Sequence, residues 1–234
     1  MLAIFKRELK AYFYSPIGYI FVGFFLLLSG YFFATDNLMH GIADIKMVFG
    51  SLNIIFLFLV PILTMRLLSE EMKNKTDQLL LTSPVSLIGI VVGKYLAAVA
   101  VFLISLIITG AYPIILYLFS SPALGEILGG YLGFFLMGAA FIAVGLFVSS
   151  LTENQVISAV ATFGVLLLLW LMDMIVPFIQ NRHIVSAVQW LSILQRFQDF
   201  TLGVLSLEPI VYYISFAVAF IFLTIRVLEK KRWS

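Results

Sequence analysis

Six long stretches of the chain carry no charged side chain, and they limit the possible folds more than any other feature. They hold between 17 and 31 uncharged residues each, whereas about 20 residues (range 17–25) cross the hydrocarbon core as an α-helix. A charge at the bilayer centre costs at least about 2.5–3.5 kcal/mol, so such stretches mark where helices can lie in lipid. The sequence therefore predicts an all-α integral membrane fold with six transmembrane helices, at about residues 17–35, 47–66, 94–119, 128–151, 155–175 and 210–227.

The composition excludes an ordinary soluble domain. Of 234 residues, 62% are hydrophobic and 11% charged, against roughly 45–50% and 25% in soluble proteins. We interpret residues 1–234 as a single membrane domain. The chain has no cysteine, which excludes disulfides, thiolate metal sites and cysteine nucleophiles. Its two histidines, His40 and His183, are dispersed, so we assign no metal, cofactor or catalytic residue to this chain.

The basic residues predict how the chain threads through the membrane. Lys and Arg are retained on the cytoplasmic side. With the N-terminus inside, eleven of the fourteen Lys and Arg residues fall in cytoplasmic segments, whereas the twelve acidic residues divide evenly. We therefore expect the N-terminus, the C-terminus and the largest polar loop to lie in the cytoplasm of a bacterial cell, with the protein spanning the plasma (inner) membrane several times.

Residues 1–15 are expected to form an amphipathic helix on the cytoplasmic leaflet. The apolar stripe comprises Leu2, Phe5, Leu9, Tyr12 and Phe13, and Lys6, Arg7, Glu8 and Lys10 lie off it. The alternative is a simple basic flank that orients the first span. Ser15-Pro16 should then turn the chain into the membrane, because the residue before proline disfavours the α region.

The longest polar stretch lies between the second and third spans. It contains Glu70, Glu71, Lys73, Lys75 and Asp77. Thr76 is suited to cap a short helix that runs through Leu80 to Pro84, with Asp77 in its first turn. The alternative is a solvated loop, which is the more common meaning of a run of charges.

Three further patterns concern packing and helix ends. Thr152 and Gln155 have capping-box spacing around Glu153, so this inner loop is suited to start the fifth helix. Pro61 and Pro113 suggest kinks, and glycines 129, 130, 133, 138 and 145 suit close packing of the fourth span. Within the aromatic outer segment 179–208, the uncharged stretch from His183 to Gln195 is too short for another crossing, so this segment is expected to be interfacial or re-entrant.

Taken in order, these segments resemble the permease subunits of type-2 ATP-binding-cassette (ABC) exporters, in particular the group that includes the gliding-motility and nitrous-oxide-reductase-maturation permeases. The resemblance covers essentially the whole chain. Residues 5–16 are similar to the family's elbow helix, 69–85 to its coupling helix, and 196–203 to its re-entrant outer segment. Gly93-Lys94 and residues 149–155 also match. One departure is Lys75, where the family usually has glycine.

The resemblance implies roles for three groups of residues. The residues implied in coupling to the ATPase are Glu70, Glu71, Lys73, Lys75, Thr76, Asp77, Leu80, Pro84 and Glu153. Those of the elbow helix are Phe5, Lys6, Arg7, Glu8, Leu9 and Tyr12. Those of the outer segment are Arg196, Phe197, Asp199, Phe200 and Gly203.

The resemblance also implies partners. Two permease subunits, identical or paralogous, would enclose a translocation pathway, and two separate ATPase subunits would hold ATP and Mg²⁺. This chain lacks the G-x-x-x-x-G-K-[ST] motif and is not expected to hydrolyse ATP or to bind nucleic acid. The alternative function is a passive channel or membrane assembly factor without an ATPase partner. Intramembrane proteolysis is disfavoured, because both histidines fall in expected outer loops.

Overall fold

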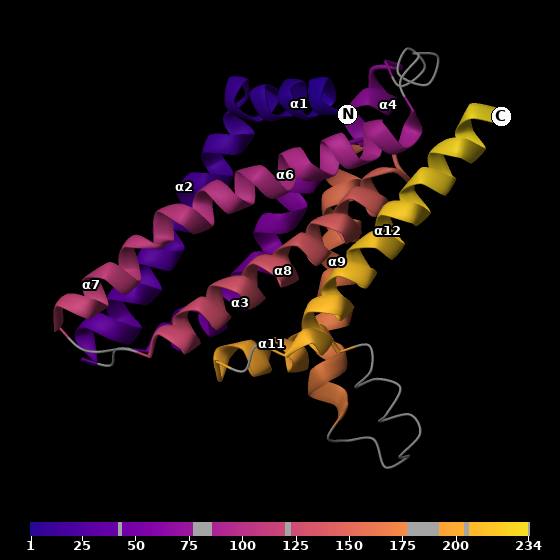
Figure 1. Cartoon of the computed structure of the whole chain (residues 1–234). Coiled ribbons are helices and arrows are strands. Elements are labelled where there is room, and N and C mark those ends of the chain that lie inside the picture. Colours follow the sequence, from indigo (N-terminus) through magenta and orange to yellow (C-terminus); the bar gives the residue numbers. More distant parts are fainter. Residues whose placement is uncertain (42–43, 77–85, 120–122, 177–191, 204–205, 234) are drawn as a thin grey trace.

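The computed structural model describes residues 1–41, 44–76, 86–119, 123–176, 192–203 and 206–233, all regular elements of which are helices (Figure 1). In chain order the elements are α1 (Leu2–Tyr14), α2 (Pro16–Phe32), η1 (Phe33–Met39), α3 (Ile45–Thr64), α4 (Ser69–Lys73), α6 (Leu87–Thr109), α7 (Ala111–Phe119), α8 (Leu124–Ser149), α9 (Gln155–Ile175), α11 (Ile193–Thr201) and α12 (Leu207–Trp233).

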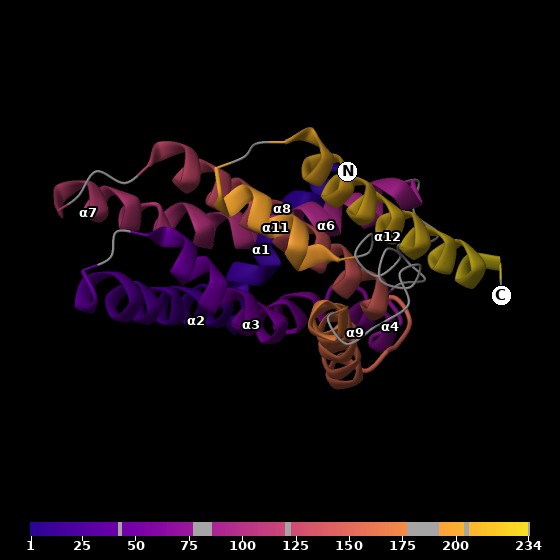
Figure 2. The ribbon, with the colours of Figure 1, turned by 90° about the horizontal axis from the view of Figure 1, so that it is seen from below.

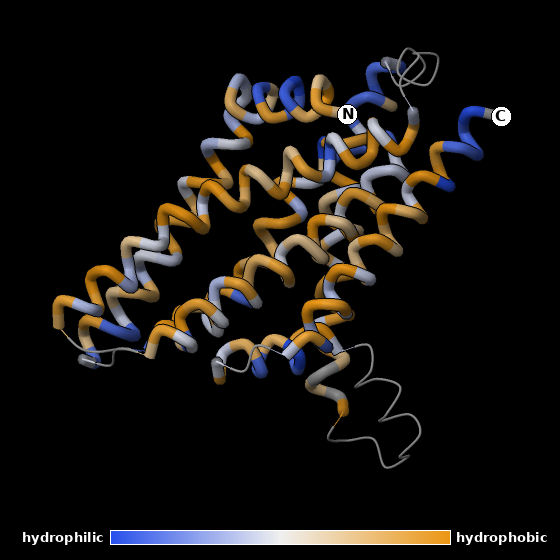
Figure 3. The backbone as a smooth tube through the Cα atoms, viewed as in Figure 1, coloured by the Kyte–Doolittle hydropathy of each residue, from blue (hydrophilic) through white to orange (hydrophobic). Residues whose placement is uncertain are grey.

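Within the described residues, six helical stretches are long and apolar enough to cross a membrane, which confirms the predicted number of candidate spans. They are Pro16–Met39, Ile45–Lys73, Leu87–Phe119, Leu124–Ser149, Gln155–Met172 and Leu207–Arg232. Apolar residues follow the shafts of these helices, and polar residues gather on α1, on α4 and at the end of α12 (Figure 3). The described part of the chain is thus an all-α bundle with apolar shafts and polar ends.

The bundle is built around α8. Of its most apolar window 72% is buried, against 17% for the corresponding windows of α9 and α12. Glycines allow the neighbouring helices to pack closely against α8. A Cβ on Gly138 would clash with two rings, because it would lie 2.9 Å from the Phe56 ring and closer still to Phe102. On Gly145 it would collide with Thr64. The predicted glycine-rich packing face of the fourth span is confirmed.

Two helices lie across the bundle, one at each end. In Figure 1, α1 crosses one end, near α4 and both chain termini, and α11 crosses the opposite end. Seen from below, in Figure 2, α9 and α12 lie at the periphery of the bundle. The N-terminus, the C-terminus and α4 therefore share one end of the molecule.

Proline breaks the helices in the way that the sequence predicted for two positions. Ser15 is extended (φ −104°, ψ 158°) and Pro16 opens α2. Pro113 lies in α7, just after the third span breaks at Gly110. Because proline cannot donate to the carbonyl four residues earlier, the Thr109 carbonyl is free to accept a hydrogen bond from the Tyr131 hydroxyl (2.6 Å).

The predicted capping box at the start of the fifth span is wrong. Asn154, rather than Thr152, caps α9, and its Oδ1 accepts hydrogen bonds from the Val156 and Ile157 amides (2.9 and 3.4 Å). The Thr152 hydroxyl accepts instead from the Asn154 amide (3.2 Å) within the preceding turn. Asparagine is as good an N-cap as threonine or better, so the later residue takes the position.

Candidate functional site

The face of α1 that packs on the bundle differs from the predicted apolar stripe. Ile4, Glu8 and Tyr12 are buried, whereas Leu2 is 65% exposed. Glu8 was expected to lie off the packed face with the other charged residues. It points inward because a buried cation, Lys94 of α6, lies opposite and offsets the cost of removing its carboxylate from water.

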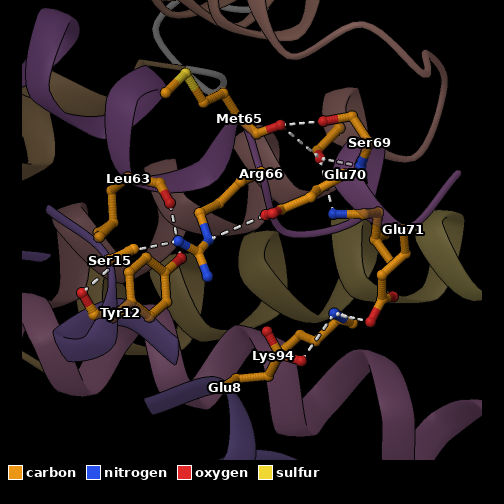
Figure 4. Close-up of polar contacts among 12 residues, drawn as sticks. Glu8, Tyr12, Ser15, Leu63, Met65, Arg66, Ser69, Glu70, Glu71 and Lys94 are labelled. Atoms are coloured by element: carbon orange, nitrogen blue, oxygen red, sulfur yellow. Dashed lines mark hydrogen bonds and ion pairs between the residues drawn. The ribbon is translucent and has the colours of Figure 1, made fainter. Parts of the chain in front are cut away.

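Lys94 is the centre of a buried ion cluster that joins three helices (Figure 4). Its side chain is 1% exposed, and its Nζ lies 3.1 Å from Glu8 Oε1 of α1 and 2.8 Å from Glu71 Oε1 of α4. Arg7 Nη2 approaches the same two oxygens, at 2.5 and 2.8 Å. Two acidic and two basic groups are thus interleaved, and each carboxylate contacts both cations.

The charge of Glu8 depends on these partners. Burial by itself would raise the pKa of the Glu8 carboxyl, but the nearby Lys94 and Arg7 charges and their hydrogen bonds outweigh burial and leave that pKa below its ordinary value. Glu8 is therefore ionised at neutral pH.

Gly93 allows α1 to approach α6 closely enough for this cluster to form. A Cβ at Gly93 would lie 3.1 Å from Ile4 Cγ2 and 3.2 Å from the Met1 carbonyl oxygen. These distances are tighter than ordinary van der Waals contact. Gly93 and Lys94 therefore act together: Gly93 leaves room for α1 to pack closely, and Lys94 binds Glu8 of α1.

A second set of contacts fastens the start of α2 and the end of α3 to α1. The Tyr12 hydroxyl donates to the Leu63 carbonyl (2.7 Å), and Arg66 Nη1 donates to Ser15 Oγ (2.6 Å). The Arg66 guanidinium also lies over the Tyr12 ring, 5.2 Å from its centroid, and 3.4 Å from Glu70. Glu70 and Glu71 of α4 thus both face toward α1 (Figure 4).

The other side of α4 is held by the end of α8. Ser149 Oγ accepts hydrogen bonds from the Leu68 and Ser69 amides (3.0 and 3.1 Å), so a residue distant in sequence supplies the cap that α4 lacks locally. Beside it, Lys231 Nζ of α12 donates to the Ser150 carbonyl (2.9 Å). Hence α4 and the turn between α8 and α9 form one unit.

This unit presents an exposed, charged surface at the end of the bundle. Lys73 of α4 and Glu153 of the α8–α9 turn are both exposed and line a shared open hollow of about 360 Å³ with Asn154, Gln155 and Val156. Unlike Glu70 and Glu71, these two charged residues are available to a partner.

Lys75 stands where the resembled family usually has glycine, and its backbone has a conformation that favours glycine. Lys75, just beyond the end of α4, has φ 55°, in the left-handed region that favours glycine. The Thr76 amide and hydroxyl both donate to the Glu71 carbonyl (2.9 and 3.3 Å), so Thr76 closes the end of α4. Asp77, Leu80 and Pro84, with the predicted short helix after Thr76, lie outside the described residues.

At the opposite end, the predicted outer segment includes α11. Phe197 and Phe200 are buried, and a Cβ on Gly133 of α8 would lie 2.6 Å from Phe200 Cβ. Arg196 lies over the Tyr212 ring (3.7 Å to the centroid), and Gly203 ends the helix with φ 74°. Asp199 is exposed. Residues 179–191 of this segment lie outside the described residues.

Several residues of this arrangement were absent from the predicted site residues, and Lys94 and Ser149 are the most important of them for α4. Lys94 and Ser149 were noted only as parts of matching motifs, although they hold α4 from its two sides. The position of Lys94 in the sequence could have identified it, because it is the cation that immediately precedes a stretch of 31 uncharged residues. Ser149 carried no signal, since a serine that caps another helix resembles any other serine at a helix end.

Comparison with known protein families gives a match over nearly the full chain. The family described as ABC-2 family transporter protein matches residues 2–232. No curated protein sequence shows significant similarity to this chain.

Proposed function

The chain belongs to the ABC-2 transporter family, and from this premise we propose that it is the permease subunit of an ATP-driven exporter, which binds separate ATPase subunits at the end of the bundle that carries α4. Two permease subunits, identical or paralogous, would form the translocation pathway in the bacterial plasma membrane. Two ATPase subunits would bind ATP and Mg²⁺, and this chain would not hydrolyse ATP.

The threading of the chain supports this arrangement. Both termini and α4 lie at one end of the bundle (Figure 1), and the segments assigned to that end contain eleven of the fourteen Lys and Arg residues. The excess of positive charge favours the cytoplasm for that end, where soluble ATPases are found. We infer that α1 lies along the inner leaflet as an elbow helix, and that α11 belongs to a re-entrant segment at the outer face.

The single observation that carries the proposal is that α4 is held on both sides while its tip stays exposed. Glu71 binds Lys94 of α6 and Arg7 of α1, and Ser149 of α8 caps the first amides of α4. A displacement of α4 would therefore move α1, α6 and α8 together. A partner that binds at Lys73 and Glu153 and changes shape with nucleotide would shift the bundle between inward-open and outward-open states.

Co-purification tests the proposal. A tagged permease should retain a soluble ATPase subunit that carries a Walker motif, detected by mass spectrometry and by ATP hydrolysis of the complex. A combined Lys73→Glu and Glu153→Lys variant should lose most of that subunit. Lys10→Glu is the matched control, since Lys10 is an exposed cation of α1; it should retain the subunit.

Glu71→Gln separates coupling from binding. Glu71 faces the buried Lys94 rather than the exposed hollow, so this variant should bind the ATPase normally but transport less per ATP hydrolysed. Recovery of the wild-type permease without any ATPase would contradict the proposal and favour a passive channel or assembly factor.

A further inference from the structure

A pocket at the outer end of the bundle contains polar groups that the coupling arrangement does not use. Its volume is about 280 Å³, close to the lower end of roughly 300–1,000 Å³ for small-molecule sites. The pocket lies between α3, α9 and α11, and it is lined by Lys46, Gly50, Asn53, Ile54, Trp170, Leu194, Phe197, Gln198 and Thr201. It has room for a small molecule or for one end of a larger one.

Asn53 is the unusual residue of this pocket. It is 9% exposed, it lies within the apolar span α3, and its Oδ1 has no hydrogen-bond partner among the described residues. Leaving a buried acceptor unpaired is unfavourable in free energy, because the group has lost its hydrogen bonds to water. A ligand that donates a hydrogen bond to Asn53 would recover that free energy.

The pocket is close to electrically neutral. Lys46, at its rim, is paired with Glu126 of α8 at 2.9 Å, so its charge is already compensated. The other polar side chains that line the pocket, Asn53, Gln198 and Thr201, are uncharged. An ionic ligand would find no unpaired counter-charge among the described residues that line the pocket and would still lose its hydration, which disfavours it.

The remaining walls are apolar and partly aromatic. Trp170 of α9 and Phe197 of α11 contribute rings, and Ile54 and Leu194 contribute aliphatic surface. Water would pair with Asn53 but gain nothing from these walls, whereas a ligand with both hydroxyl groups and C–H faces matches both kinds of surface. Amide side chains beside an aromatic ring are suited to this mixed chemistry.

We propose that this pocket is a binding site for a neutral polyhydroxylated group of about the size of a sugar ring, with Asn53 accepting a hydrogen bond from one hydroxyl, Gln198 and Thr201 facing others, and Trp170 covering a C–H face. The group can belong to a free sugar or to the head group of a glycolipid. The site needs no ATPase subunit, so its failure and failure of the proposed function are separable.

Fluorescence of Trp170 tests the proposal directly. The chain has three tryptophans, and replacing Trp190 and Trp233 by Phe leaves Trp170 as the sole reporter. The protein is purified in a detergent without sugar, placed in phosphatidylcholine nanodiscs, and titrated with glucose, octyl glucoside or octyl phosphocholine. We expect a saturable change with octyl glucoside and none with octyl phosphocholine.

Two variants and one control examine the polar groups. Asn53→Leu removes the acceptor at similar volume and should weaken binding about tenfold, as expected for loss of one hydrogen bond. Gln198→Ala changes an exposed side chain of α11 and should also weaken binding; it decides the matter if Asn53→Leu does not fold. Thr162→Val is the matched control, because Thr162 Oγ1 is also buried without a partner among the described residues but lies outside the pocket.

Each result has a defined meaning. A similar response to glucose and octyl glucoside identifies a free sugar as sufficient, and a response to octyl glucoside alone identifies a lipid head group. An equal response to octyl phosphocholine, no saturable response to either sugar compound, or unchanged affinity in folded Asn53→Leu would overturn the proposal.

Discussion

The two helices that lie across the bundle, α1 at one end and α11 at the other, are held by different physical means. α1 is bound by charge, since Glu8 contacts the buried Lys94 of α6. α11 is bound by shape, since the Phe200 side chain lies against Gly133 of α8 and the Phe200 backbone carbonyl lies against Gly129. The first contact should respond to charge and pH, and the second to volume.

The strongest test of this contrast is Lys94→Met. It leaves the carboxylates of Glu8 and Glu71 close together without their shared buried cation, and breaking a buried ion pair costs roughly 3–5 kcal/mol. The free energy of unfolding, from SDS titration followed by circular dichroism, should fall by about that amount. Lys46→Met is the control, because Lys46–Glu126 is a more exposed pair (25% and 41%) and should cost about 0–1 kcal/mol. Equal losses would contradict the contrast.

The second test changes volume at the other end. Gly133→Val places a methyl-bearing carbon where Phe200 lies 2.6 Å away, and overpacking of this kind costs about 1–3 kcal/mol. In a double-mutant cycle, Phe200→Ala should recover part of the loss. Gly164→Val on α9 is the control, since no atom of the described residues lies within 4 Å of its added Cβ. Additive effects of the Gly133 and Phe200 changes would show that the two residues do not interact.

The third test uses pH. Because the Glu8 pKa lies below its ordinary value of 4.5, its contribution is complete above about pH 4.5 and is lost as the pH falls through the lowered pKa. The groups that face Glu8 are Arg7, Glu71 and Lys94. A spin label on an introduced cysteine in α1 should become mobile in acid.

A label at the same kind of position on α11 should respond less, because the Phe200 contact with Gly129 and Gly133 carries no titratable group. The ion pair between Arg196 of α11 and Glu208 of α12 is long (3.9 Å), and the Glu208 side chain is 83% exposed. Glu8→Gln should make the α1 label mobile already at neutral pH and remove the pH response. A pH response that persists in Glu8→Gln would assign the titration to another group.

The smallest expected effect compares the two left-handed helix ends. Lys75 (φ 55°) lies just beyond the end of α4, and Gly203 (φ 74°) lies just beyond the end of α11. A left-handed residue other than glycine costs about 1–2 kcal/mol, so Lys75→Gly should stabilise and Gly203→Ala should destabilise, each by about 1 kcal/mol after the entropy of glycine is counted. The same SDS titration measures both, and a destabilising Lys75→Gly would show that the lysine side chain contributes contacts of its own.

The sequence by itself determined that most of the chain is suited to lipid rather than water, how many candidate spans it has, and where several of its helices begin or end. Lipid offers no partner for a charge, so only uncharged stretches can cross it. It also offers no partner for backbone N–H and C=O groups, so these stretches had to cross as helices. Pro16 had to open a helix because its ring fixes φ and removes the amide donor. The glycines of the fourth span predicted close packing for the same kind of local reason, the absence of a side chain.

Only the tertiary structure decided which polar groups meet. Glu8 was expected to point away from the bundle, and its inward position depends on Lys94, which is 86 residues further along the chain. Ser149 caps α4 across a similar separation, and Asn154 displaces Thr152 as the cap of α9. A short-range pattern shows which side chains need partners. It does not show which distant residue supplies one, because that depends on how the apolar shafts pack.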